Sequence, residues 1–234
     1  MALKHLPRIE SLHLADVVLP ENHPMAGEPC VVQAFLVRHP QGNVLVDTGV
    51  GADHSGIEQL YRPIRRPLGE ALAAVGLAPR DIAMLISTHL HFDHCGENRL
   101  FPGVPIYVQA DEYEAARQPL YTIQGWVDFP GARYELLHGD AELREGLHVV
   151  PTPGHTAGHQ SVVLEAGDAV AVIAGQAAYS ADEFASKRAL ADENSSWDRD
   201  LYEKSLASLR DLRPLFGYFS HDPTVWQVVD ETRP

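Results

Sequence analysis

The chain has 234 residues with a formal net charge of −14, because 32 Asp and Glu outnumber 18 Lys and Arg. This acidic balance argues against nucleic-acid partners and polybasic membrane contacts, and no apolar run is long enough for a transmembrane helix. The chain has thirteen His but only two Cys, too few for a disulfide framework, and its N-terminus lacks the pattern of a signal peptide, so we expect a reducing cytoplasm.

The chain contains no fixed-period repeat and no long linker, so we expect a single domain over residues 1–234. In the first half, short β-branched runs alternate with helical spacing. The elements expected there are strands at 30–39 and 43–49 joined by a turn at 39–42, a helix at 66–76 ending at Gly76, a buried strand at 81–88, a strand at 104–110, and a helix at 111–118 that opens with acidic residues.

The second half follows the same alternation. The elements expected are strands at 147–154, 160–167 and 168–175, an amphipathic helix at 197–212 with its stripe at Leu201, Leu206, Leu209 and Leu212, and an apolar segment at 216–221 that ends in His. Mixed strands and helices in two similar halves predict an α/β fold in which two sheets pack together with helices outside.

The most informative segment is Ser87–Gly96, which contains the pattern H-x-H-x-D-H. In an extended segment, residues two apart point the same way, so His89 and His91 can converge on one ion. Asp93 and His94 follow as the chain turns, and can face a second ion nearby. Imidazole nitrogens and carboxylate oxygens suit Zn²⁺, Mn²⁺ or Fe²⁺. Four such groups within six positions favour a metal site over a polar loop with chance histidines.

This segment resembles the signature of the metallo-β-lactamase superfamily. Further landmarks of that family occur in order: Asp47-Thr-Gly49, Pro153–His159 and Ser220-His-Asp222. The resemblance implies a four-layer αβ/βα sandwich of two mixed sheets with a dinuclear metal site. It implies two ligand sets: His89, His91 and His155 for one ion, and Asp93, His94 and His221 for the other. The ions expected are zinc first, with iron, manganese or cobalt as alternatives.

Within this superfamily, the chain is most similar to the N-acyl homoserine lactonases. That branch has a Tyr three residues after an Asp that bridges both metals, and here Tyr179 lies three residues after position 176. The resemblance places the Tyr179 phenol beside the substrate carbonyl. The alternative is a packed aromatic whose hydroxyl is hydrogen-bonded.

Position 176 departs from the family pattern, because Gln176 stands where those lactonases have the bridging Asp. A neutral amide offers only a weak carbonyl ligand and no negative charge to offset the repulsion of two ions. We therefore expect one weakened site, a longer metal–metal distance, or partial single-metal occupancy. The alternatives are that Gln176 lies near the centre without binding metal, or contacts substrate.

Several neighbouring residues have less specific signals. Asp47 is expected to orient a metal-binding His through its other ring nitrogen, and His159 either to hold the His155 loop by a hydrogen bond or to be a plain loop residue. For Cys95 we favour a small buried thiol over a soft ligand. Four aromatic residues either line an acyl pocket or belong to the core, and we favour the core for them: Phe101, Tyr121, Trp126 and Phe129.

The resemblance implies hydrolysis of a lactone or related small-molecule ester by metal-activated hydroxide. Tyr179 and one metal would stabilise the oxyanion, and Asp93 would shuttle the proton to the leaving group. One alternative keeps the metal site but changes the substrate to a thioester, β-lactam, phosphodiester or sulfate ester. The other, which Gln176 favours, is a degenerate member that binds ligand or one metal with little turnover. Monomer and homodimer both remain open.

Overall fold

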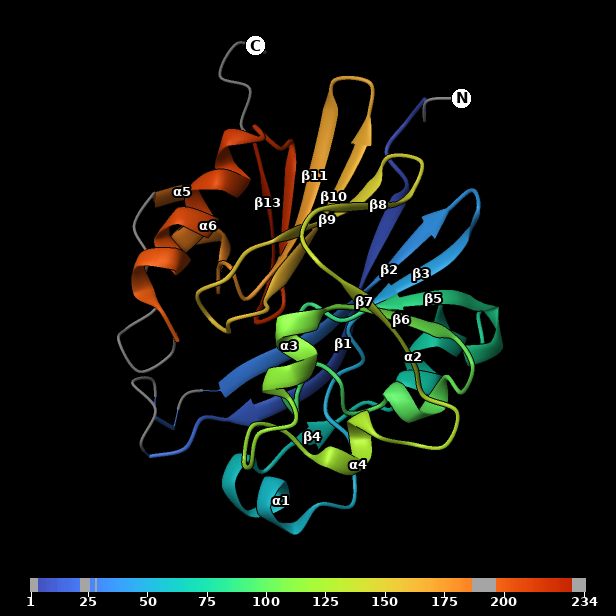
Figure 1. Cartoon of the computed structure of the whole chain (residues 1–234), viewed down its shortest axis with the longest axis vertical. Coiled ribbons are helices and arrows are strands. Elements are labelled where there is room, and N and C mark those ends of the chain that lie inside the picture. Colours follow the sequence, from blue (N-terminus) through green and yellow to red (C-terminus); the bar gives the residue numbers. More distant parts are fainter. Residues whose placement is uncertain (1–3, 22–25, 28, 187–196, 229–234) are drawn as a thin grey trace.

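The computed structural model describes residues 4–21, 26–27, 29–186 and 197–228, which form two sheets with helices on their outer faces (Figure 1). The seven-stranded sheet has the order β4-β1-β2-β3-β5-β6-β7. Its strands are β1 (Arg8–Val18), β2 (Pro29–His39), β3 (Gly42–Val46), β4 (Ile64–Arg65), β5 (Ile82–Ile86), β6 (Pro105–Gln109) and β7 (Arg133–Leu137).

The second sheet has six strands in the order β13-β12-β11-β10-β9-β8. They are β8 (Ala141–Arg144), β9 (Leu147–Pro151), β10 (Gln160–Ala166), β11 (Ala169–Gly175), β12 (Phe216–Phe219) and β13 (Asp222–Gln227). The helices are α1 (Ser55–Tyr61), α2 (Leu68–Ala74), α3 (Ala110–Ala115), α4 (Gln124–Val127), α5 (Ala181–Ser186) and α6 (Arg199–Asp211), with 3₁₀ turns at Pro79–Asp81 and Asn98–Leu100. Both sheets mix parallel and antiparallel pairs.

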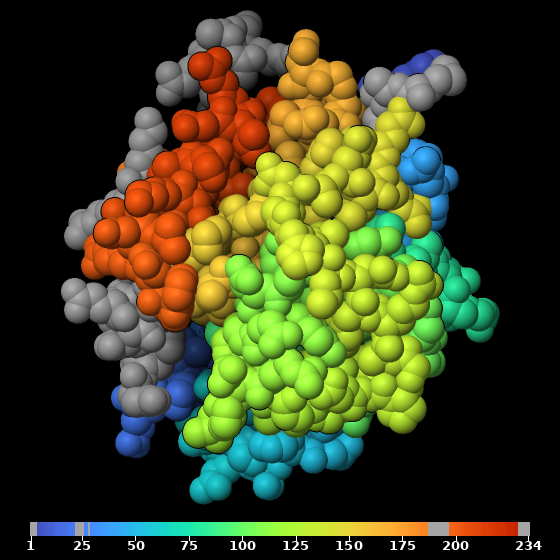
Figure 2. Space-filling model, in the orientation of Figure 1, coloured from blue at the N-terminus to red at the C-terminus, as the bar shows by residue number. Residues whose placement is uncertain are grey.

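The four layers follow from the two-residue period of the strands. On β2, Phe35 and Val37 face the second sheet, whereas Ala34 and Leu36 face the helices outside the first. The second sheet is likewise covered by α5 and α6, whose buried residues pack on the outer side of β10 and β11. The expected αβ/βα sandwich is therefore confirmed. In the space-filling view, orange-red α6 lies beside the green and yellow-green middle of the chain (Figure 2).

Most expected elements are present with shorter bounds. The predicted hairpin is confirmed, since β2 pairs with β3 and His39 lies opposite Gly42. The predicted helix at 66–76 is α2, and Gly76 has the positive φ of 78° that favours glycine after a helix. The predicted long helix is confirmed as α6, but the prediction of its buried face was partly wrong. Tyr202 and Ser205 are buried there, whereas Leu212 is exposed.

Several elements were not predicted: β1, β4, β7, β8, β13, α1, α4 and α5. The largest omission is β1, whose regular alternation is broken by a bulge between His13 and Ala15. Among the helices of the described residues, none is long and apolar enough to cross a membrane.

Candidate metal centre

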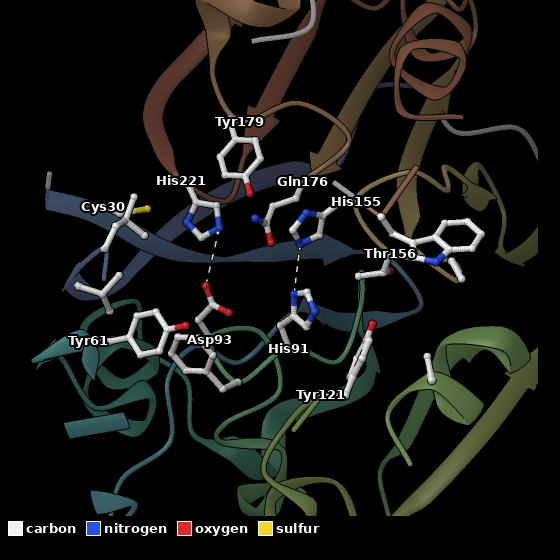
Figure 3. A pocket seen from close by; sticks show the side chains of 16 residues that line it. Cys30, Tyr61, His91, Asp93, Tyr121, His155, Thr156, Gln176, Tyr179 and His221 are labelled. Carbon is white, nitrogen blue, oxygen red and sulfur yellow. Dashed lines mark hydrogen bonds and ion pairs between the residues drawn. The ribbon is translucent and has the colours of Figure 1, made fainter. Parts of the chain in front are cut away.

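The candidate ligands gather because several strands end at the same edge of the sandwich. His89, His91, Asp93 and His94 follow β5, and Asp47 directly follows β3, its parallel neighbour. Gln176 and His221 follow the parallel strands β11 and β12, and His155 lies between β9 and β10. The structure thus brings all six predicted ligands together in two adjacent groups, although they come from distant parts of the chain. Figure 3 shows four of them, His91, Asp93, His155 and His221.

The first group consists of His89, His91 and His155. The Nδ1 atom of His91 lies 3.1 Å from Nε2 of His89 and 3.2 Å from Nε2 of His155. Two nitrogens bound to one tetrahedral zinc at about 2.0–2.1 Å lie about 3.3–3.4 Å apart. The three ring nitrogens are therefore spaced as ligands of one small ion would be.

The second group consists of Asp93, His94 and His221. Oδ2 of Asp93 lies 3.7 Å from Nε2 of His94 and 3.8 Å from Nε2 of His221. The buried Nε2 of His94 has no hydrogen-bond partner. Nδ1 of His221 donates to the carbonyl of Val31 at 2.8 Å, which leaves Nε2 to face Asp93. An unpartnered buried nitrogen is costly unless a ligand satisfies it, so the group fits a cation.

Asp47 orients His94 from behind. Its buried carboxylate accepts hydrogen bonds from the Thr88 N–H and hydroxyl, both at 2.7 Å, and from Nδ1 of His94 at 2.8 Å. Asp47, which directly follows β3, adopts a positive φ of 62°. These bonds keep the proton on Nδ1 and leave the Nε2 lone pair free for a metal.

His159 joins two chain segments and belongs to neither ligand group. Its Nδ1 lies 3.1 Å from the Thr152 carbonyl, and its Nε2 accepts a hydrogen bond from the Gln176 backbone N–H at 3.0 Å. The ring must therefore be neutral. It anchors the start of the His155 loop and the backbone of Gln176 together.

Gln176 lies between the two groups and is 5% exposed. Its buried Oε1 has no hydrogen-bond partner. In Figure 3, the amide nitrogen faces Tyr179 and the oxygen points toward the space between His91 and Asp93. The neutral oxygen is thus placed where it can meet an ion or a substrate.

Tyr179 presents its hydroxyl to the same space (Figure 3). Its ring stacks on His221, with centroids 5.6 Å apart, and its backbone N–H donates to Glu183 at 2.6 Å. Burial raises the pKa of the Tyr179 phenol, and the nearby Asp93 carboxylate adds to the shift. The phenol therefore stays protonated and able to donate a hydrogen bond.

Burial sets the protonation of the histidines around the centre. It lowers the pKa of His91 to about 4 and that of His159 to about 3, and it lowers the pKa of His89 strongly. His221 differs: burial opposes its charged form, but Cys30, Asp93 and the Val31 carbonyl raise its pKa to about 9. Burial also works against the charged form of Asp93, yet the neighbouring histidines outweigh it and lower the pKa of that carboxyl.

A cleft of about 580 Å³ opens over both groups. The apolar and aromatic residues of its lining are Val17, Leu19, Cys30, Tyr61, Phe92, Ala115, Tyr121, Ala157 and Trp197. Of the four aromatics considered from sequence, Tyr121 lines this cleft. The other three are core residues: Phe101 and Phe129 pack beside the first sheet, and Trp126 packs against Val50 and Ile57.

The two cysteines have different surroundings, and both are free. Cys95 is fully buried with its Sγ 3.4 Å from the Leu90 carbonyl, and burial raises the pKa of its thiol to about 12. This confirms the small buried thiol expected for it. Cys30 lies in the cleft wall beside His221, which sequence reasoning missed. Only its place at the start of a strand was visible in the sequence.

The chain is similar to known proteins over most of its length. The profile of the metallo-β-lactamase superfamily matches residues 27–221. An N-acyl homoserine lactonase of Bacillus sp. is 31% identical over 210 residues, covering 82% of this chain and 81% of the relative. The N-acyl homoserine lactonase AttM of Azorhizobium caulinodans is 29% identical, with 83% of each chain covered.

Solved structures of N-acyl homoserine lactone hydrolases superpose on most of this chain. The crystal structure of a quorum-quenching N-acyl homoserine lactone hydrolase superposes with a TM-score of 0.79 at 26% identity, covering 95% of both chains. Another such hydrolase, with the product N-hexanoyl-L-homoserine bound at its catalytic metal centre, superposes with a TM-score of 0.76 at 27% identity and the same coverage.

Proposed function

Because the chain belongs to the metallo-β-lactamase superfamily, we propose that it is a metal-dependent hydrolase that opens lactone rings of the N-acyl homoserine lactone type. The observation that carries this proposal is the pair of adjacent ligand groups beneath an apolar-walled cleft, with the Tyr179 phenol pointing between them. The carbonyl group of such a lactone would lie at the metal centre, and its acyl chain would contact the apolar walls of the cleft. The similarity to lactonases over four-fifths of the chain supports the same substrate class.

We propose that two divalent ions, with zinc first, occupy the two groups. The nitrogen spacing within the first group and the unpartnered Nε2 of His94 support this assignment. The bound ions would lower the pKa of a water molecule toward about 7 and polarise the substrate carbonyl. His89, His91 and His155 would hold one ion, and Asp93, His94 and His221 the other.

The protein's own groups would act on the substrate as follows. Tyr179 would donate a hydrogen bond to the carbonyl oxygen as negative charge develops there. Oδ2 of Asp93 faces His94 and His221, so Oδ1 is the oxygen that would take the proton from the attacking water and pass it to the leaving alkoxide. No covalent bond between enzyme and substrate is needed.

Gln176 favours a second candidate function, a member of the family with weak metal binding and little turnover. Its buried Oε1 carries no formal charge. Two ions at about 3.5–4 Å repel strongly unless anionic groups lie between them. In this candidate, the protein holds one ion firmly and binds the lactone without efficient hydrolysis.

We further propose that the chain works as one domain on a small molecule, as a monomer or homodimer, without a nucleic-acid or membrane partner. The acidic composition supports the absence of a nucleic-acid partner. A cytoplasmic location is supported by the two free thiols.

A substrate panel tests these proposals. Metal-loaded protein is incubated with N-acyl homoserine lactones of several chain lengths, simple esters, thioesters, a β-lactam and a phosphodiester. We expect the lactones to be opened fastest. Faster turnover of another class would assign the centre to that substrate, and an intact panel at full metal loading would overturn the hydrolase proposal.

A further inference from the structure

Glu112 is a fully buried carboxylate in the first turn of α3, outside both ligand groups. Its Oε1 accepts hydrogen bonds from the Leu90 N–H at 2.8 Å and from the Tyr121 hydroxyl. Its Oε2 accepts from the Thr156 hydroxyl at 2.6 Å. One carboxylate therefore receives three hydrogen bonds.

Two of these donors, in Leu90 and Thr156, lie in the two segments that carry the three-histidine group. Leu90 stands between His89 and His91, so its N–H fixes the backbone that separates two ligands. Thr156 directly follows His155 in the other segment. Glu112 is thus a single point of attachment for both segments.

Close packing reinforces this attachment. A Cβ added to Gly158 would lie 2.1 Å from the Glu112 backbone nitrogen, so the His155 loop touches the start of α3 directly. On the other side of that loop, a Cβ on Gly154 would lie 2.3 Å from the Tyr202 Cα on α6. The loop is therefore confined between two helices, and Glu112 sets its position relative to the His89–His91 segment.

Tyr121 extends the contact to the wall of the cleft. Its hydroxyl donates to Glu112, its ring centroid lies 4.8 Å from that of His91, and it lines the cleft. The same carboxylate therefore fixes part of the surface that a substrate would meet.

Stability alone does not account for a carboxylate here. Burial raises the pKa of the Glu112 carboxyl, although its hydrogen bonds with Thr156, Tyr121 and Leu90 act in the opposite direction. Replacing buried charged groups by apolar side chains of similar volume is often neutral or stabilising. What an apolar side chain cannot do is accept hydrogen bonds from two separate segments and hold them in register.

We propose that Glu112 is a positioning residue that holds the three histidines in metal-binding geometry and ties them to Tyr121 in the cleft wall. This inference rests on the proposed metal centre but not on the identity of the substrate. Outer groups that orient metal ligands typically change metal affinity or activity about 10–100-fold when mutated. Glu112 would orient the histidine ligands through the backbone and hydroxyl groups next to them, rather than by a hydrogen bond to an imidazole ring.

The first test is Glu112→Gln, because one amide oxygen cannot serve the donors on both sides. We expect the zinc affinity, measured by competition with a chromophoric chelator, to fall about 10–100-fold. We also expect the visible absorption spectrum of the Co²⁺-loaded protein to change, since that spectrum reports ligand geometry. Unchanged affinity and an unchanged spectrum, with only a lower melting temperature, would overturn the proposal.

Two milder variants decide the matter even if Glu112→Gln fails to fold. Tyr121→Phe and Thr156→Val each remove one donor and keep the side-chain shape. The matched controls are Tyr134→Phe and Thr122→Val. They remove hydroxyls that contact Asn98 and Cys95, respectively, and not Glu112.

We expect Tyr121→Phe and Thr156→Val to weaken zinc binding less than Glu112→Gln does and to shift the Co²⁺ spectrum, while the controls do neither. If test variants and controls behave alike, Glu112 has no positioning role. These measurements need no substrate. A protein that binds zinc but opens no lactone would therefore overturn the proposed lactonase function and leave this inference standing.

Discussion

The two candidate ligand groups lie side by side but would hold a cation by different means. His89 of the first and His94 of the second have ring centroids only 4.0 Å apart. The first group is three imidazoles without a carboxylate, and its segments are attached to Glu112. The second contains Asp93 and is backed by Asp47. We therefore expect geometry to maintain the first group and negative charge to maintain the second.

Removing the charge from the second group should have the largest effect. We expect Asp93→Asn to lower kcat for lactone opening by about 10²–10⁴-fold, because it removes the proposed proton carrier. The same variant should lose about one ion per chain, because it removes an anionic ligand. Metal analysis and initial rates measure both. Asp168→Asn, at an exposed turn between β10 and β11, is the control. An Asp93→Asn protein with normal metal and rate would refute the role of charge.

The next largest effect should come from Tyr179→Phe, which leaves both groups intact and removes only the hydroxyl. Loss of one donor to a developing oxyanion typically lowers kcat by about 10²–10³-fold. We expect that loss with unchanged metal content. Tyr218→Phe on β12 provides a matched control, since Tyr218 packs between the sheets. If Tyr179→Phe keeps full activity, Tyr179 is a packing residue.

Gln176→Asp tests whether missing charge between the groups limits the centre. An added carboxylate should tighten the weaker ion about tenfold, which corresponds to about 1.4 kcal/mol, and should raise the rate. Gln176→Asn is the matched control, because it has the length of Asp without the charge. Equal metal affinity in the two variants would show that charge at this position does not matter. Lower activity of Gln176→Asp at full metal would instead indicate that Gln176 contacts substrate.

The smallest effect concerns pH and the metal-free protein. The pKa of His159 is about 3 in the folded state, compared with about 6.5 in an unfolded chain. Between these values the unfolded state binds more protons, so the free energy of unfolding rises with pH, by at most about 1.4 kcal/mol per pH unit for this residue. Urea unfolding from pH 4 to 6.5 should show a shallower rise in His159→Gln. An identical slope would contradict the lowered pKa.

Local sequence was sufficient for the parts of the site that lie in short motifs. The pattern from His89 to His94 needs only the two-residue period of an extended chain to suggest converging ligands. Strands β2 and β3 are rich in β-branched residues and are joined by a short turn, so their pairing was predictable as well. The grouping of His155 and His221 with them came from family resemblance, since no local pattern connects segments so far apart.

Tertiary packing determines what sequence could not predict. Glu112 was interpreted as an acidic residue favoured at a helix start, but α3 turns it inward against both ligand segments. Cys30 lines the cleft because β12 brings His221 next to the start of β2. Phe101 and Phe129 occur near Tyr121 in sequence yet lie in the core. In each case, the direction of a side chain depends on contacts with remote segments.

The most direct test of the central claim is titration of metal-free protein with zinc, with bound metal and the opening of an N-acyl homoserine lactone measured on the same samples. We predict that ring opening is absent without metal, rises with the zinc-to-protein ratio, and is abolished by a chelator. Protein with both groups filled that leaves the lactone intact would contradict the account.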